Sequence, residues 1–194
     1  MHIVKLGGSL YDTPNLNHWL ARLHTLAQQQ ALVIVPGGGP FADQVRQAQQ
    51  QHQFDDRSAH HMAILAMAQF GLLLHGLLPS ANIINVPAAV TATPQLSIWI
   101  PDARLLDADI AQNWQITSDS LALWFAQQLP AVQQLSLIKR IRPATGDLQQ
   151  LSQHTIIDRG FAGLYQQHPI ATQIVNFHDV DQFPNTAVTL YLCG

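Results

Sequence analysis

The sequence predicts an α/β fold, a three-layer αβα sandwich around a mainly parallel sheet. Short apolar runs typical of buried strands recur along the chain, and segments with helical spacing of apolar residues separate most of them. Alternation of this kind indicates parallel strands with helices on both faces of the sheet. The length of 194 residues and the hydrophobic content of 47% favour one domain, residues 1–194, that buries its own core.

The first half of the chain has the more regular pattern. Strands are expected at residues 2–6 (HIVKL), 31–35 (ALVIV), 82–86 (NIINV) and 96–100 (LSIWI). A helix is expected after Pro14, where apolar side chains recur at helical spacing: Leu16, Trp19, Leu20, Leu23 and Leu26. Pro40 suits the first turn of a second helix through Val45, and a long apolar helix is expected from Ser58 to about His75.

The second half is less regular. Residues 101–113 are polar and show no clear periodicity. Further strands are expected at residues 114–117, 135–141, 154–158, 172–177 and 186–193, and helices at 118–129 and 159–168. Residues 141–150 have the composition of a turn.

Two features of the composition restrict the chemistry. The chain contains no glutamate, so all 12 acidic residues are aspartates and any carboxylate chemistry must rest on them. Among the nine lysines and arginines, only Lys5 and Lys139 are lysines, and both lie in expected strands.

The charge and the hydropathy pattern argue against two classes of partner. A net charge of −3 with no basic block is unlike a nucleic-acid surface, and no uninterrupted apolar run approaches the roughly 20 residues of a membrane helix. Cys193 is the single cysteine, so no intramolecular disulfide is expected, and no leader-like segment precedes the first strand. We therefore expect a cytoplasmic protein that binds a small molecule.

Glycine clusters follow the first two expected strands, at Gly7-Gly8-Ser9 and at Gly37-Gly38-Gly39. In a parallel α/β sheet, ligands bind beyond the carboxyl ends of the strands, where glycine lets backbone N–H groups approach an anion closely. A single glycine at a strand end is usually only a tight turn. Two clusters in matching positions favour two phosphate-facing turns at one edge of the sheet, although neither fits the P-loop or the dinucleotide-binding fingerprint.

Three motifs resemble the amino acid kinase family, which includes acetylglutamate, uridylate and isopentenyl phosphate kinases. They are K-L-G-G-S at residues 5–9, P-G-G-G at 36–39, and T-S-D-S-x-A at 117–122 followed by the strand L-x-L-I-K. The resemblance covers nearly the whole chain. Residues 54–71 and 113–126 are similar in finer detail to the subfamily of [5-(aminomethyl)furan-3-yl]methyl phosphate kinases.

The resemblance implies an ATP-dependent kinase that uses Mg²⁺ and transfers the γ-phosphoryl group to a small phosphorylated acceptor. In the subfamily this acceptor is an aminomethylfuran-methyl phosphate, and the diphosphate product leads to methanofuran-type one-carbon cofactors. Residues 1–113 would form the acceptor-side half and residues 114–194 the nucleotide-side half. The resemblance also implies a homo-oligomer.

Lys5, Asp119 and Lys139 are the expected catalytic residues. Phosphoryl transfer needs mainly positioning and positive charge on the transferring group, and Lys5 lies close enough to the first glycine turn to supply that charge. Matching aspartates in the family orient the phosphate-binding lysines, which implies the same role for Asp119 beyond that of a helix cap. The expected phosphate- and nucleotide-binding residues are Gly7, Gly8, Ser9, Ser120 and Arg140.

Lys139 lies where the chain departs from the family pattern. The T-D-V-x-G-type nucleotide loop that often ends this strand is absent, and so is the late G-G-x-x-x-K segment that supplies a second lysine in several relatives. We therefore expect Lys139 to replace that lysine. The alternative is a solvated lysine at a strand edge, and Arg140 has the similar alternative of an ordinary surface residue.

The expected acceptor-binding residues are Gly37, Gly38, Gly39, Asp56 and Arg57. The guanidinium of Arg57 suits an acceptor phosphate, and Asp55 or Asp56 suits an acceptor amine. No metal site is expected at His60-His61, because adjacent helical side chains diverge by about 100° and no ligand set is complete. Trp99 and Trp114 are expected in the core rather than against a ligand.

Three other functions remain open from the sequence. The acceptor could be another phosphate monoester, such as isopentenyl phosphate or a nucleoside monophosphate. The chain could bind nucleotide without catalysis, an alternative that the missing C-terminal features favour. It could also be a purely structural α/β subunit, which would bind no nucleotide.

Overall fold

The computed structural model describes residues 1–191, so Cys193 and the end of the strand expected at 186–193 lie outside the described residues. The strands are β1 His2–Leu6, β2 Ala31–Pro36, β3 Asn82–Ile84, β4 Gln95–Trp99, β5 Gln134–Lys139, β6 Thr172–Asn176 and β7 Val188–Thr189. The helices are α1 Asn15–Ala27, α2 Gly39–His52, α3 Asp56–Leu77, α4 Ser118–Gln127, α5 Leu148–Gln153 and α6 Phe161–Gln167. Short 3-10 segments lie at Gly8–Leu10, Pro87–Ala89 and Ala103–Asp107.

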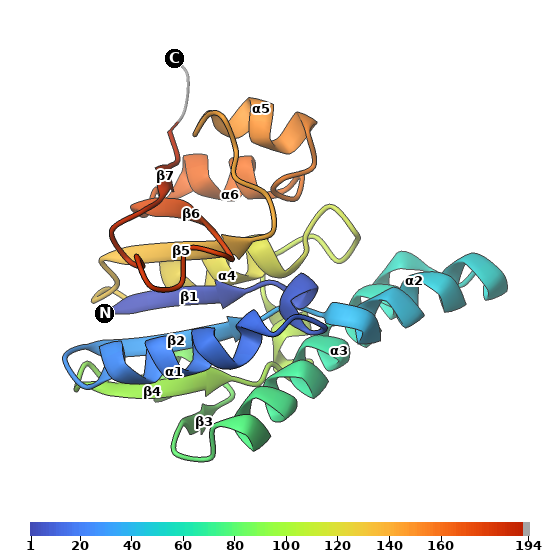
Figure 1. Ribbon diagram of the computed structural model, residues 1–194. Helices are drawn as coiled ribbons and strands as arrows, with labels where there is room; N and C mark the ends of the chain where they lie inside the picture. Colours follow the sequence, from blue (N-terminus) through green and yellow to red (C-terminus); the bar gives the residue numbers. More distant parts are fainter. Residues whose placement is uncertain (192–194) are drawn as a thin grey trace.

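The strands form one mainly parallel sheet in the order β3-β4-β2-β1-β5-β6-β7. All neighbouring strands are parallel except β7, which runs antiparallel to β6. Helices cover both faces of this sheet (Figure 1), which confirms the predicted three-layer sandwich. Because β1 lies between β2 and β5, the ends of these three strands meet at the centre of one edge.

Each face of the sheet has its own hydrophobic core. The core beneath α1 includes Trp19 and Phe183, both fully buried, and the opposite core beneath α4, α5 and α6 includes Phe125 and Phe161. The helix α2 extends away from the carboxyl edge of the sheet and packs along α3 (Figure 1). This arrangement leaves space at that edge between the glycine turns and the start of α4.

The long helix α3 is apolar along most of its length. Its mean hydropathy of 1.2 makes it the one helix within residues 1–191 that could cross a membrane by length and composition alone. Phe70 and Leu74 are fully buried in the core, as in the core helices of globular proteins.

Two expected strands are absent and are corrected here. Residues 114–117 and 154–158 form turns that lie outside the sheet, and hydrogen bonds join the two loops. The Gly160 N–H donates to the Gln115 carbonyl at 2.8 Å, and the Thr117 N–H donates to the Asp158 carboxylate at 2.9 Å. The turn expected at 141–150 is also shorter than predicted, since Asp147 caps α5 and the helix starts at Leu148.

Candidate active site

Lys5, Asp119 and Lys139 meet at the carboxyl edge of the sheet. Lys5 is paired in register with Leu137, and Lys139 lies two residues further along β5, so both lysines project on the same face. The helix α4 packs on this face and carries Asp119 in its first turn. The ammonium of Lys5 lies 2.9 Å from Oδ1 of Asp119, and the ammonium of Lys139 lies 2.5 Å from Oδ2. One carboxylate therefore holds both lysines of the chain.

Burial and the oppositely charged neighbours shift the pKa values of Asp119 and Lys5 in opposite directions. Lys5 and Asp119 are each about 5% exposed, while the Lys139 side chain reaches 18%. Burial alone would raise the pKa of Asp119, but the two ammonium groups outweigh it and lower the pKa to about 2. Burial lowers the pKa of Lys5, and the carboxylate of Asp119 opposes that shift. The carboxylate of Asp119 thus stays ionised and favours the charged form of Lys5 against the effects of burial and of Lys139.

The two glycine turns touch each other beside the lysines. The Gly37 N–H donates to the Leu6 carbonyl at 2.8 Å, which fixes the second turn against the end of β1. A Cβ on Gly8 would lie 2.1 Å from the backbone nitrogen of Gly39, so only glycine fits this contact. Gly39 itself has a positive φ of 55°. Because Gly8 and Ser9 open a 3-10 helix, their N–H groups have no acceptor within it.

Asp158 is a site residue that the sequence analysis missed. Its carboxylate accepts hydrogen bonds from the Thr117 N–H at 2.9 Å, the Thr117 hydroxyl at 2.8 Å and the Ser120 N–H at 3.0 Å. The Ser120 hydroxyl donates to the same carboxylate, and Ser120 lines neither of the cavities described below. Burial and the nearby Asp119 raise the pKa of Asp158. The carboxylate thereby holds the first turn of α4, which carries Asp119.

Two connected cavities surround this edge of the sheet. Cavity A, of about 610 Å³, lies between the glycine turns, α2, α3 and the start of α4. Cavity B, of about 590 Å³, lies over Lys5, Asp119 and Lys139 and reaches the loop at 155–159. Arg46, Trp114, Thr117 and Ser118 line both cavities, so the two spaces join there.

Arg46 lies at the junction of the two cavities, whereas the sequence analysis named Arg57 as the residue for the acceptor phosphate. The guanidinium of Arg46 lies 4.3 Å from the centre of the Trp114 ring and 3.1 Å from Asp43 on the same helix. Arg57 is exposed in the first turn of α3 and lines neither cavity. The sequence did contain a signal for Arg46. Helical spacing places residue 46 on the same face of the helix as residue 39, one of the glycines, and as residues 42 and 43 between them.

Of the remaining predicted residues some line the cavities and others, including Gly7 and Gly37, do not. Gly38 and Gly39 line cavity A, whereas Asp56 lines cavity B and accepts a hydrogen bond from Gln49 at 2.8 Å. Asp55 caps α3 by accepting from the Ser58 N–H. Trp99 is in the core as expected, with 1% exposure, but Trp114 is half-buried and lines the cavities, which corrects its predicted core position.

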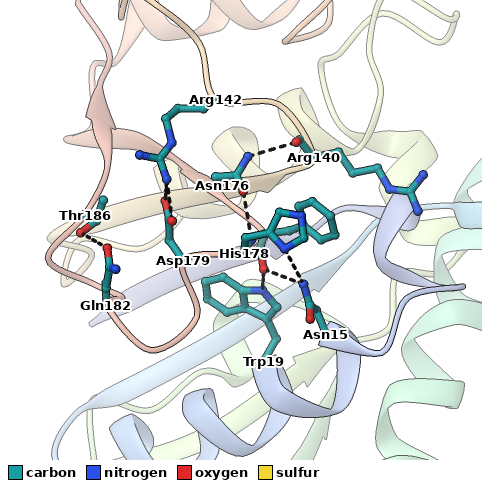
Figure 2. A network of polar contacts seen from close by, with 10 residues as sticks. Asn15, Trp19, Arg140, Arg142, Asn176, His178, Asp179, Gln182 and Thr186 are labelled. Atoms are coloured by element: carbon teal, nitrogen blue, oxygen red, sulfur yellow. Dashed lines mark hydrogen bonds and ion pairs between the residues drawn. The ribbon is translucent and has the colours of Figure 1, made fainter.

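Arg140 lies at the mouth of cavity A, after the end of β5. Its guanidinium is 3.2 Å from Asp12 and points away from the polar network that holds the neighbouring loop (Figure 2). In that network Asn176 donates to the Arg140 carbonyl, and Trp19 of α1 donates to the Phe177 carbonyl at 2.9 Å. Arg142 forms an ion pair with Asp179 at 2.6 Å. These contacts tie the loop after β6 to α1 and fix the backbone from which Arg140 extends.

Comparison with known families gives a match over most of the chain. The model of the amino acid kinase family matches residues 1–141. A [5-(aminomethyl)furan-3-yl]methyl phosphate kinase from Methanocaldococcus jannaschii is 35% identical over 135 residues. That alignment covers 66% of this chain and 61% of the relative, so the matched part spans less than two thirds of the relative's length.

Solved structures of the same architecture have much lower sequence identity. Uridylate kinase from Archaeoglobus fulgidus superposes with a TM-score of 0.74 at 16% identity, covering 99% of both chains. An isopentenyl phosphate kinase superposes with a TM-score of 0.56 at 14% identity, covering 94% of this chain and 95% of that one. At these identities the superpositions show a shared fold.

Proposed function

We propose that this chain, which belongs to the amino acid kinase family, transfers the γ-phosphoryl group of ATP to a small phosphorylated acceptor. The observation that carries the proposal is the placement of both lysines on Asp119, directly beside two touching glycine turns. Two fixed ammonium groups and free backbone N–H groups suit the three charged oxygens of a phosphoryl group in transfer. Lys5 and Lys139 are the two lysines of the sequence, so the chain offers no other lysine for this role.

The proposed reaction is an in-line displacement. An oxygen of the acceptor phosphate attacks the γ-phosphorus, the bond from that phosphorus to the β-bridging oxygen breaks, and ADP leaves. Lys5 and Lys139 stabilise the charge that spreads over the transferring oxygens, and Asp119 holds both lysines in position. Cavity B would hold the nucleotide phosphates and cavity A the acceptor. Residues of both expected halves line each cavity: Gly8, Ser9 and Arg140, expected at the nucleotide, line cavity A, and Asp56, expected at the acceptor, lines cavity B.

Mg²⁺ fits this site as an ion carried by the nucleotide. Asp119 is engaged by two lysines and Asp158 by four donors, so neither carboxylate is free to coordinate a metal. Mg²⁺ commonly binds ATP phosphates with few protein ligands and keeps several waters. When bound it would neutralise phosphate charge, and the protein's own contribution remains the two ammonium groups.

The acceptor we propose is an aminomethylfuran-methyl phosphate, on the way to a methanofuran-type cofactor. The proposal is supported by the relative from Methanocaldococcus jannaschii, whose name states that substrate. The cavities support it too. Arg46 lines cavity A and also cavity B, which contains the lysines, so it suits the acceptor phosphate, and Ala63, Ile64 and Met67 of α3 make part of the wall of cavity A apolar. ATP as donor accords with the expected cytoplasmic location.

The test is ADP formation by the purified chain with ATP and Mg²⁺. The acceptors are [5-(aminomethyl)furan-3-yl]methyl phosphate, isopentenyl phosphate and UMP, and ³¹P NMR identifies the diphosphate product. We expect turnover with the furan phosphate and little with the other two. Tight ATP binding without ADP release on any acceptor would instead indicate a nucleotide-binding protein.

We also propose a homo-oligomer that pairs through α3. Met62, Leu65 and Leu72 are exposed to between 39% and 54% and lie three and seven residues apart on one side of this helix. Exposed apolar side chains at this spacing favour burial against a second helix. Light scattering should give a mass that is a multiple of 21.4 kDa, and Leu65→Lys should reduce it to one copy.

A further inference from the structure

His60 is a buried polar residue in cavity A that no step of the proposed reaction uses. It lies on α3, it is 4% exposed, and its Nε2 atom has no hydrogen-bond partner among residues 1–191. The side chain lines the cavity, whereas the adjacent His61 lines neither cavity. A buried polar atom without a partner is uncommon and costs stability, so its retention in a cavity wall indicates a ligand.

The surroundings of His60 keep its imidazole neutral. Its neighbours in the cavity wall include the apolar side chains of Ala63, Ile64 and Met67. Burial lowers the pKa of His60. A hydrogen bond with the Asn113 backbone partly offsets this shift, and the nearby His61 lowers the pKa further. A neutral imidazole donates from one nitrogen and accepts at the other, so it can bind a hydroxyl or an amine.

The charged groups of cavity A are already paired with each other. Asp43 forms an ion pair with Arg46 at 3.1 Å, and Asp12 forms one with Arg140 at 3.2 Å. Both pairs are exposed to solvent, while His60 is buried in the wall. Among the described residues that line cavity A, His60 is therefore the polar side chain that is buried, since Ser9, Thr117 and Ser118 are at least partly exposed.

We infer that His60 selects the acceptor by binding a hydroxyl or amine group remote from the acceptor's phosphate. The inference rests on the proposed function, which assigns cavity A to the acceptor. An acceptor with a purely hydrocarbon end would bury the imidazole without a partner, and such a mismatch disfavours binding by about 10- to 100-fold. His60 would thus exclude hydrocarbon phosphates and admit polar ones of the same size.

The experiment compares two acceptors that differ in one group. They are [5-(aminomethyl)furan-3-yl]methyl phosphate and its 5-methyl analogue, and their dissociation constants are measured by calorimetry for each variant. We expect the wild-type chain to bind the amine at least about tenfold more tightly than the methyl analogue. His60→Phe should bring the ratio close to one, mainly by weakening the amine, and His60→Gln should restore part of it.

His61→Phe is the matched control and should keep the wild-type ratio. The melting temperature and the ATP dissociation constant of each variant show whether His60→Phe still folds and binds nucleotide. Retention of the wild-type ratio in His60→Phe, or a wild-type chain that binds both phosphates equally or neither of them, overturns the inference. Turnover is measured separately, so absence of ADP release contradicts the proposed function without deciding the role of His60.

Discussion

The ammonium group of Lys139 lies 2.5 Å from Oδ2 of Asp119, although the two residues are 20 positions apart in the sequence. The other oxygen of the same carboxylate faces Lys5. A solvated lysine at a strand edge would point away from the glycine turns, and Lys139 instead lines cavity B beside Lys5. This geometry favours a two-lysine site over the surface alternative.

Removing Lys5 should reduce turnover far more than stability. We expect Lys5→Met to lower kcat by about 100-fold or more, because one preorganised charge at a transferring group is typically worth roughly 3–4 kcal/mol. The measurement is steady-state ADP release with saturating ATP and acceptor. Arg104→Met is the control, since it removes an exposed cation that is paired with Asp102 and lines neither cavity, and it should leave kcat unchanged.

Asp158 should act through the position of α4 rather than by touching substrate. Asp158→Ala leaves the Thr117 and Ser120 donors without their acceptor, and each unsatisfied buried donor costs about 1–3 kcal/mol. We expect a lower melting temperature together with a lower kcat. Asp181→Ala, at an exposed carboxylate, should change neither quantity. A stable Asp158→Ala protein with full activity would remove this residue from the site.

The contact between the glycine turns should tolerate no side chain. Gly8→Ala places its Cβ against backbone atoms of Gly39, which cannot rotate away, so the turns must separate. We expect at least tenfold weaker ATP binding, read by calorimetry. Gly163→Ala on α6 is the control, because no atom lies within 4 Å of its added Cβ, and it should stabilise the protein by about 0.5–1 kcal/mol. Equal ATP affinity in both variants would contradict the assignment of the glycine turns to phosphate binding.

His2 should make stability depend on pH. It is 4% exposed with Nε2 at 2.8 Å from the Ser136 hydroxyl, and burial with the charge of the N-terminus lowers its pKa from 6.5 to about 4. Between pH 6.5 and about pH 4 the unfolded chain binds a proton at His2 that the folded chain does not. The free energy of unfolding therefore decreases as the pH falls through this interval, and the decrease is complete below about pH 4. The loss is roughly 3 kcal/mol.

Urea unfolding at pH 7 and at pH 4 measures this effect. His2→Gln removes the titrating group and should make the free energy of unfolding less sensitive to pH over this interval. An unchanged pH dependence in His2→Gln would mean that other groups cause it.

The central strands of the sheet could be predicted from the sequence because their signals are local. The apolar runs of β1, β2 and β5 locate these strands, and Pro14 and Pro40 precede or open the helices α1 and α2. Parallel strands share a carboxyl edge, so both glycine turns were expected side by side, and their backbones do touch.

The errors lie where tertiary contacts override local preference. Residues 114–117 and 154–158 have strand-like composition, yet Ile116 and Ile157 are buried as parts of loops that bond to each other. Asp158 could not be found from spacing, since it lies 38 residues from Ser120 and no local pattern joins them. Arg46 rather than Arg57 lines the cavities, because the residues of the start of α3 that border them are Asp56 and His60, and Arg57 is exposed.

The most direct test of the two-lysine site is Lys139→Met, assayed for kcat and for the ATP dissociation constant. Methionine keeps most of the side-chain volume and removes the charge, so a charge that acts mainly in the transition state should be lost from kcat alone. We predict an ATP dissociation constant within about threefold of wild type and a kcat lowered by about 100-fold or more. A kcat equal to wild type, with only a small change in melting temperature, would contradict the account.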